Sequence, residues 1–212
     1  MVYVTPGSFL MGSPEKELER NAMREQQHEV TISQGYWMAT FETSQKVWQK
    51  IMKYNPSKIK NEQHPVESVS WNEVQEFISK ANKNDGKFRL PYEAEWEYAC
   101  RAGTTTSYAG HRDLMTWHRG NASATTHPVD SKKSNAWGLH NMHGNVGEWC
   151  QDWFTEDISK YNLDPKGPVE GDRKIQRGGQ YTGRVRHTRS ADRSSSQPST
   201  ASFFAGFRLV HD

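Results

Sequence analysis

The residues that could do chemistry in this chain are few and scattered. Among its 212 residues there are only two cysteines, Cys100 and Cys150. Two are too few for a disulfide framework or a cysteine-rich zinc site. We interpret them as two buried thiols in a reducing compartment, with a single bridge between them as the alternative. The nearest pair among the nine histidines is His140 and His143. A metal site there would need further ligands, so we expect hydrogen-bonded loop histidines.

Three carboxylates follow one another closely in the sequence, at Asp152, Glu156 and Asp157. Two carboxylates can share acid and base roles when their surroundings separate their pKa values. The preferred interpretation is a charged loop. We therefore predict no catalytic residue in this chain.

The overall charge favours no particular class of polyanion or surface. Lys and Arg number 27 and Asp and Glu 25, which leaves a net charge of +2. That balance does not predict nucleic-acid binding. The longest apolar runs are only a few residues, so no membrane span is expected. Met1 leads directly into Val2-Tyr3-Val4, which predicts no signal peptide in this chain. The location stays open between cytoplasm, viral particle and displayed surface.

The segment 180–206 has an unusual composition. It contains no Lys, Glu, Met, Trp, Leu or Ile and is rich in Ser, Thr, Gly, Arg, Tyr and Phe. Aromatic rings give rigid contact area, hydroxyl groups and glycine give adaptable contacts, and arginine supplies anchors, so this is the vocabulary of a binding surface. A Ser-rich loop without a ligand is the alternative. The expected contact residues are Tyr181, Thr182, Gly183, Arg184, Arg186, His187, Asp192, Ser194, Ser195, Ser196, Ser199, Thr200, Ala201, Ser202, Phe203 and Phe204.

The elements that must hold this segment are readable in the first half of the chain. Strands are expected over 2–11, with a turn at Pro6-Gly7, and over 30–38. Residues 14–29 between them are charged and predict an exposed loop. Thr43 can cap a helix whose face carries Val47, Trp48, Ile51 and Met52.

Two further helices have clear start signals. Ser70 and Glu73 form a capping box, and Pro91 suits the first turn of a helix that stops at Gly103. After residue 104 the helical period disappears, which predicts short strands and long ordered loops. With 16 Gly, 9 Pro and only 33% hydrophobic residues, the chain predicts one loop-rich α+β domain over 1–212, with short mixed or antiparallel strands.

Several segments, in order along the chain, resemble the formylglycine-generating-enzyme or sulfatase-modifying-factor family. That resemblance implies the C-type lectin fold of this family and says little about activity, since one fold hosts many functions. The segments are 7–13, 64–66, 69–71, 89–91, 93–99, 135–139, 141–149, 177–179, 189–191 and 206–208. One local departure is Tyr92, where the family usually has a capping Thr; its loss should cost about 1 kcal/mol.

The resemblance also implies which residues the oxidases of the family use. They hold Cu(I) on two cysteines in the C-terminal third, because soft thiolates select Cu(I). Here no cysteine follows Cys150, and Cys100 and Cys150 match framework positions. We therefore expect no bound copper and no formylglycine synthesis. An oxidase with another metal arrangement, and a non-catalytic structural or regulatory member, remain the alternatives.

A calcium loop is a second implication of the resemblance. The family binds Ca²⁺ through an Asn-x-x-Gly-x-x-x-Glu loop, and its positions fall on Asn141, Gly144, Val146 and Glu148. Ca²⁺ takes six to eight oxygen ligands, often including backbone carbonyls. A hydrogen-bonded loop without metal is equally compatible with these residues, and any metal is expected to be structural.

The segment 180–206 is most similar to the variable region of diversity-generating-retroelement proteins, which use this fold. In that system randomised Asn codons end in a pyrimidine and cannot encode Lys, Glu, Met, Trp or Gln, so Gln180 and Gln197 would have to be fixed by the template. The implied function is binding of varied protein or glycan ligands through 181–204. Positions implied to be invariant are Arg189-Ser190-Ala191, Arg193, Pro198 and Gly206-Phe207-Arg208.

Overall fold

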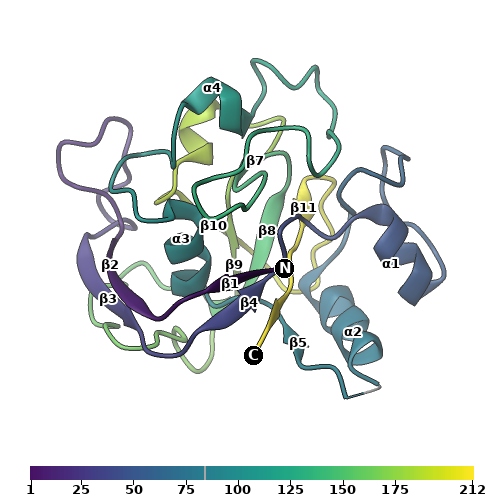
Figure 1. Ribbon diagram of the computed structural model, residues 1–212, viewed down its shortest axis with the longest axis horizontal. Helices are drawn as coiled ribbons and strands as arrows, with labels where there is room; N and C mark the ends of the chain where they lie inside the picture. The colour runs from purple at the N-terminus through teal and green to yellow at the C-terminus, as the bar shows by residue number, and fades with distance from the viewer. Residues whose placement is uncertain (84) are drawn as a thin grey trace.

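The computed structural model describes residues 1–83 and 85–212. Four α-helices and many short strands make up the mixed α/β fold, as predicted (Figure 1). No helix in these two ranges is long and apolar enough to cross a membrane. The helices are α1 (Gln45–Met52), α2 (Trp71–Ala81), α3 (Glu93–Arg101), α4 (Arg112–Met115) and the 3-10 helix η1 (Val185–Thr188).

Local capping signals account for where the first two long helices begin. The N-cap of α1 is Ser44, whose hydroxyl accepts from the Val47 N–H; the prediction of Thr43 was wrong by one residue. At α2 the predicted capping box is present, because Ser70 and Glu73 exchange hydrogen bonds between side chain and backbone. These reciprocal bonds satisfy donors that the helix itself leaves free.

The start of α3 is held differently. Its N-cap is Tyr92, whose backbone N–H donates to Glu95 Oε2 at 2.8 Å. The Glu93 N–H donates to Asp152 Oδ2 at 2.7 Å. Asp152, which is 59 residues away in the sequence, therefore accepts from the first backbone N–H of α3. This N–H follows Tyr92, where the family usually has a capping Thr.

Two four-stranded sheets and two strand pairs form the β part. The first sheet has the order β1-β4-β12-β5, so the two ends of the chain lie on the same sheet, either side of β4 (Figure 1). The second has the order β10-β9-β8-β11. The bounds are β1 Val2–Val4, β2 Gly7–Met11, β3 His28–Ile32, β4 Tyr36–Met38, β5 Phe88–Arg89, β6 Thr116–Trp117, β7 His143–Gly144, β8 Gly147–Trp153, β9 Lys174–Arg177, β10 Arg193–Ser196, β11 Ala205–Gly206 and β12 Val210–His211.

Two apolar clusters support these sheets. One surrounds Trp96 of α3 and includes Cys100 and Cys150; the other contains Trp48 stacked on Phe77, with ring centroids 5.3 Å apart. Both thiols are buried and unbridged, as the favoured interpretation predicted. Large aromatic rings thus build a core in a chain with few aliphatic residues.

The second half matches the prediction except for two short helices. Most of it consists of turns and short strands, but α4 and η1 each form about one helical turn. Elements this short carry too little periodicity to be recognised in a sequence window. In Figure 1 they lie together at the top of the molecule, away from α1 and α2.

Candidate ligand-binding surface

The segment 180–206 runs over the second sheet. It contributes η1, the edge strand β10 and the strand β11, which pairs in parallel with β8. The rigid partners of this segment are therefore β8 and β9, which lie between β10 and β11.

Solvent reaches every predicted contact residue except Tyr181. The Tyr181 side chain is only 3% exposed, and its backbone N–H donates to the Asn145 carbonyl. Tyr181 is therefore part of the supporting core, and its expected place on the contact surface was wrong. The remaining residues are exposed or half-buried: Thr182, Gly183, Arg184, Arg186, His187, Asp192, Ser194, Ser195, Ser196, Ser199, Thr200, Ala201, Ser202, Phe203 and Phe204.

Many of these residues surround one hollow of about 430 Å³. That volume lies in the range of ligand pockets. It is lined by nine of the predicted contact residues: Gly183, His187, Asp192, Ser194, Ser195, Ser196, Thr200, Ser202 and Phe204. The structure does not bring Thr182, Arg184, Arg186, Ser199, Ala201 or Phe203 to this hollow.

The rest of the lining of this hollow comes from residues outside the expected contact set, of which Gln176 alone lies in no segment that the sequence had marked. Gly147 of β8 and Gln176 of β9 line it together with Gly179 and Gln180. Gly179 has a φ of +73°, and a Cβ there would lie 2.2 Å from the His187 carbonyl oxygen. Only glycine lets η1 approach so closely. In the sequence, the motif Arg177-Gly178-Gly179 marked Gly179, a position where the chain needs glycine.

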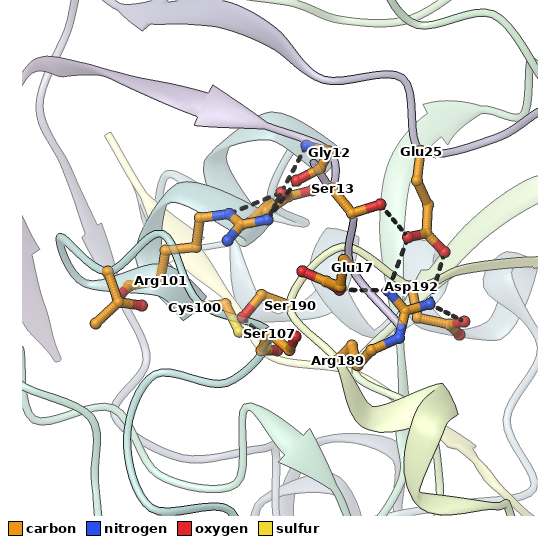
Figure 2. A network of polar contacts seen from close by, with 12 residues as sticks. Gly12, Ser13, Glu17, Glu25, Cys100, Arg101, Ser107, Arg189, Ser190 and Asp192 are labelled. Atoms are coloured by element: carbon orange, nitrogen blue, oxygen red, sulfur yellow. Dashed lines mark hydrogen bonds and ion pairs between the residues drawn. The ribbon is translucent and has the colours of Figure 1, made fainter. Parts of the chain in front are cut away.

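Buried ion pairs lie directly beneath the surface. Figure 2 shows Arg189 between Glu17 and Glu25, with distances of 2.6 and 2.8 Å from its Nη1. The Arg189 and Glu25 side chains are 3% and 1% exposed. Burial raises the pKa of Glu25, but the hydrogen bonds from Arg189 and Ser13 outweigh it and lower the pKa overall. This pair ties the 14–29 loop to the framework through Glu25, while most of the loop is exposed, as predicted.

A second buried pair continues the framework. Arg193 Nε and Nη2 donate to Glu93 at 2.6 and 2.7 Å in a fork-to-carboxylate contact. Burial raises the pKa of Glu93, and the charge of Arg193 more than offsets this and lowers it. Arg177 pairs with Glu97 and donates to the Ser190 carbonyl at 3.0 Å. The residues implied to be invariant here are thus structural anchors.

Exposure alternates sharply along this segment. Arg189, Ser190, Ala191 and Arg193 are all buried, whereas Ser194 beside them is exposed. The residues 206–208 are also buried, and Pro198 is half-buried. Exposed side chains are therefore interleaved with buried side chains that hold the core.

The histidine and cysteine candidates are structural. His143 Nδ1 donates to the Thr188 carbonyl at 2.8 Å and its Nε2 accepts from the Ala109 N–H at 3.1 Å. Burial lowers the pKa of His143 to about 4 and raises that of the adjacent Cys100 to about 12. His140 hydrogen-bonds the Lys132 carbonyl through Nδ1. A neutral imidazole beside a protonated thiol has no activated nucleophile.

The three carboxylates at 152–157 do not form a paired acid and base, because they lie in different surroundings. Asp152 is buried on β8, and burial raises its pKa to about 8, whereas Glu156 and Asp157 are exposed. The charged-loop interpretation holds for the last two. For Asp152 it was wrong, because its carboxyl group caps α3.

The loop matched to calcium ligands has a mixed character. Asn141 Oδ1 is buried without a hydrogen-bond partner, while its Nδ2 donates to Glu42 at 3.0 Å. The Glu148 carboxylate already accepts three hydrogen bonds. Arg208 donates to both of its oxygens, at 2.7 and 2.6 Å, and Trp96 donates at 2.7 Å to one of them. A carboxylate offers about four lone-pair sites, so one acceptor site remains on Glu148 Oε1.

Glu42 is a carboxylate that the sequence did not point to. It is fully buried, accepts from the side chains of Asn141 and Asn145, and burial together with the charge of Glu148 raises its pKa to about 8. The unpaired Asn141 Oδ1, the Glu42 carboxyl group and the remaining acceptor site of Glu148 are oxygen donors of the kind that Ca²⁺ takes. Arg208 occupies the other positions of Glu148, and the described residues contain no group of three or more His, Cys, Asp or Glu side chains that could hold a metal ion.

Comparison with known proteins places these features in context. The family model described as "Sulfatase-modifying factor enzyme 1-like domain" matches residues 1–212. The chain is 37% identical over 171 residues to the formylglycine-generating enzyme of Streptomyces coelicolor, covering 70% of this chain and 53% of that enzyme. It is 29% identical over 236 residues to the serine/threonine-protein kinase pkn1 of Chlamydia caviae, covering 99% of this chain and 37% of the kinase. The chain thus spans about half or less of the length of these relatives.

Solved structures show the same fold. Treponema denticola variable protein 1 superposes with a TM-score of 0.90 and 26% identity, covering all of this chain and 94% of that protein. PvdO from Pseudomonas aeruginosa superposes with a TM-score of 0.92 over 99% of this chain and 93% of PvdO, at 22% identity. Both similarities extend over the whole arrangement of elements that carries the 180–206 segment.

Proposed function

The chain belongs to the family of sulfatase-modifying factor enzyme 1-like domains, and from this premise we propose that it is a binding protein for a macromolecular ligand, protein or glycan. The observation that carries the proposal is the segment 180–206. Its predicted contact residues, apart from Tyr181, are accessible and nine of them surround one hollow, while buried ion pairs hold the backbone behind them. A surface of variable polar and aromatic groups on a rigid support is the physical requirement for binding.

We propose further that a retroelement diversifies this surface. The absence of Lys, Glu, Met and Trp from 180–206 is what codons ending in a pyrimidine would give. The similarity to Treponema denticola variable protein 1 supports the idea. The alternation of buried Arg193 and exposed Ser194 supports it as well, since substitution at the second position leaves the first untouched.

Sequencing this gene in sibling isolates tests the proposal. Differences should concentrate at the accessible residues of 181–204 and spare Arg189, Arg193 and the buried 206–208. A neighbouring reverse-transcriptase gene and an Asn-rich near-copy of the segment should accompany the gene. Differences spread evenly over the chain would refute diversification, although binding by a fixed surface would survive that result.

The competing function is oxidation of a substrate cysteine to formylglycine, favoured by the 37% identity to the Streptomyces coelicolor enzyme. Against it stands the cysteine inventory: Cys100 and Cys150 are both buried framework residues. The experiment is incubation of the copper-reconstituted protein with a cysteine-containing peptide and oxygen, followed by mass spectrometry. We expect no formylglycine, and turnover would establish the enzyme.

We also propose that a structural Ca²⁺ binds the 141–148 loop. Asn141, Gly144, Val146 and Glu148 would hold it, through side-chain oxygens at 141 and 148 and main-chain oxygens at 144 and 146. Glu42 lies close enough to Asn141 for a 3.0 Å hydrogen bond and would supply further negative charge. The supporting observations are the unpaired Asn141 Oδ1 and the raised pKa of Glu42.

A further inference from the structure

A second and larger hollow, of about 540 Å³, adjoins the first. Five arginines line it, three of them from outside 180–206, with Glu19, Asn21 and Ala22 from the N-terminal loop. The two hollows have four lining residues in common: His187, Asp192, Ser194 and Ser195. A single ligand that covers these four residues therefore reaches both hollows.

The positive charge in this second hollow is only partly neutralised. Arg193 is paired with Glu93, and Arg24 lies 3.4 Å from the half-exposed carboxylate of Glu156. The other three arginines have no carboxylate within 4.0 Å anywhere in residues 1–83 and 85–212. They are Arg20, Arg173 and Arg186.

The bonds of these three arginines leave most of their N–H groups free. Arg20 Nε donates to the Ser13 hydroxyl and its Nη2 to the Glu25 carbonyl, at 3.1 and 3.4 Å. Arg173 Nη2 donates to the Ser195 carbonyl at 2.9 Å. Arg186 contacts the His187 ring at 3.2 Å. Since a guanidinium has five N–H donors, each arginine keeps two or more for a ligand.

The acidic groups of the hollow do not balance this charge. The Asp192 carboxylate lies 3.5 Å from Arg189 and 3.4 Å from His187, so these two side chains partly neutralise it. Glu19 is exposed. An anion entering the hollow therefore meets several guanidinium groups and one free carboxylate.

The N-terminal side of the hollow is fixed by the framework beneath it. Figure 2 shows Glu17, Glu25 and Ser13 joined to Arg189 or to each other. Arg20 is between these anchors in the sequence. Arginines held in place need less ordering when a ligand binds, which favours affinity.

We propose that this second hollow is an anion subsite that takes an Asp or Glu side chain of a protein ligand. Arg20, Arg24 and Arg173 lie outside the 180–206 segment and would give the subsite its constant charge, while Arg186 and the neighbouring residues of the segment would determine which protein is bound. The planar guanidinium matches the two oxygens of a carboxylate. Among the described lining residues there is no Phe, Tyr or Trp, and the one aromatic ring is the imidazole of His187, so the charged guanidinium groups outnumber the rings on which a sugar could stack. This inference rests on the proposed binding function and assigns a ligand class to it.

The test uses a fluorescein-labelled hexaglutamate peptide as the probe, with hexaglutamine as the uncharged control, and measures fluorescence anisotropy at low salt. The variants Arg173→Gln and Arg186→Gln should each weaken hexaglutamate binding about tenfold, equivalent to about 1.4 kcal/mol. Arg119→Gln is the matched control, since this exposed arginine lines neither hollow but removes the same charge. It should change the Kd less than twofold. Thermal melts of all variants check that each is folded.

Three outcomes overturn the subsite. The first is an equal loss of hexaglutamate binding in all three variants, which would indicate an effect of net charge alone. The second is hexaglutamine binding as tight as hexaglutamate binding. The third is Arg173-dependent binding of heparin without binding of the peptide. None of them bears on where sibling genes differ, so the subsite can fail while the proposed function stands. Conversely, an evenly varying gene with an Arg173-dependent peptide site would keep the subsite and refute diversification.

Discussion

Neighbouring residues in the 180–206 segment have opposite physical roles. Arg189 and Arg193 are buried and neutralised by Glu25 and Glu93, each through two short N–H···O contacts. Removing one partner of such a pair leaves an uncompensated charge in the interior, which costs about 3–5 kcal/mol. The exposed Ser194 has no such constraint. Residues that stabilise the fold and residues that face solvent are thus separated at the level of single positions.

The substitution Arg189→Met should lower the free energy of unfolding by about 3–5 kcal/mol, because Glu25 loses its counter-charge. The pH dependence should also invert. In the native protein the lowered pKa of Glu25 gives stability that is present above its unfolded pKa and lost as pH falls through the folded pKa. Without Arg189, burial, the largest influence, raises that pKa against the remaining hydrogen bonds from Ser13 and Asn21, and stability should fall as pH rises from about 4.5.

Urea unfolding of this variant at several pH values measures both effects. Arg119→Met is the control, because Arg119 is exposed and has no carboxylate within 4.0 Å in the described residues. It should change stability by less than about 0.5 kcal/mol. An Arg189→Met protein as stable as the native one would show that the pair is not an anchor.

At the scale of elements, strand β10 combines both roles. Among the described residues it is an edge strand, paired with β9. Its first residue, Arg193, is buried against α3, and Ser194, Ser195 and Ser196 line the first hollow. An edge strand that is anchored at one end can change its side chains without losing its register.

The triple substitution Ser194→Tyr, Ser196→Tyr and Thr200→Tyr should therefore leave the fold intact. Ser194 and Thr200 are exposed and Ser196 is half-buried, and each change is expected to alter stability by about 0.5 kcal/mol or less. The matched control is Arg193→Ser, on the same strand, which should destabilise by several kcal/mol because Glu93 stays buried and unpaired. Circular dichroism melts compare the two, and a triple variant that fails to fold would contradict a tolerant surface.

Helix α3 depends on another strand for its N-terminal cap. Asp152 on β8 accepts the Glu93 N–H, and burial followed by the charge of Glu93 raises the pKa of Asp152 to about 8. A raised carboxyl pKa gives stability that is complete below the unfolded pKa and is lost as pH rises through the folded pKa. The stability of the native protein should therefore decline between about pH 4 and pH 8 in part through this group.

Asp152→Asn removes that contribution while an amide oxygen still accepts from the helix. The free energy of unfolding of the variant should vary less over the same pH range, and chemical denaturation at each pH measures it. Asp157→Asn serves as control, since Asp157 is exposed on a loop and is not expected to alter the slope. Identical slopes for Asp152→Asn and the native protein would mean that the carboxyl does not titrate in this range.

At the scale of the whole molecule, the loops are held by buried polar contacts that join distant parts of the chain. Glu42 lies next to Asn141, 99 residues away, and Arg189 binds Glu25 across 164 residues. Arg208 bonds Glu148 and the carbonyls of Ala39 and His140. A loop-rich chain with short strands gains its rigidity from such contacts, which a surface for macromolecular binding requires.

Calcium should raise the melting temperature of the native protein if the 141–148 loop binds it. A ligand at about 100 times its Kd stabilises by about 2.7 kcal/mol. The gain should be larger at pH 8.5 than at pH 6, because Glu42, with a pKa of about 8, must lose its proton to face a cation. Asn141→Leu should abolish the shift. Magnesium is the control ion, and an equal shift in the variant would refute the site.

Much of the local architecture and the family were predictable from the sequence, because their signals are local. The Ser70 capping box, the Trp48 face of α1 and the ordered motifs of the family each lie within a few residues. The composition of 180–206 was also readable in the sequence, since the omission of residue types needs no spatial information. The short α4 and η1 were missed because one turn gives no period to detect.

What only the tertiary structure decided is which of these residues is inside and what it contacts. Tyr181 belongs to the core rather than the surface, Asp152 to the cap of α3, and Glu148 to Arg208. The clustering of Arg20, Arg173 and Arg186 around one hollow is equally invisible in the sequence. The partners of Asp152 and Glu148 lie 59 and 60 residues away in the sequence, and burial and charge pairing depend on distance in space. A linear pattern therefore identifies the vocabulary of the surface, and the fold alone determines its geometry.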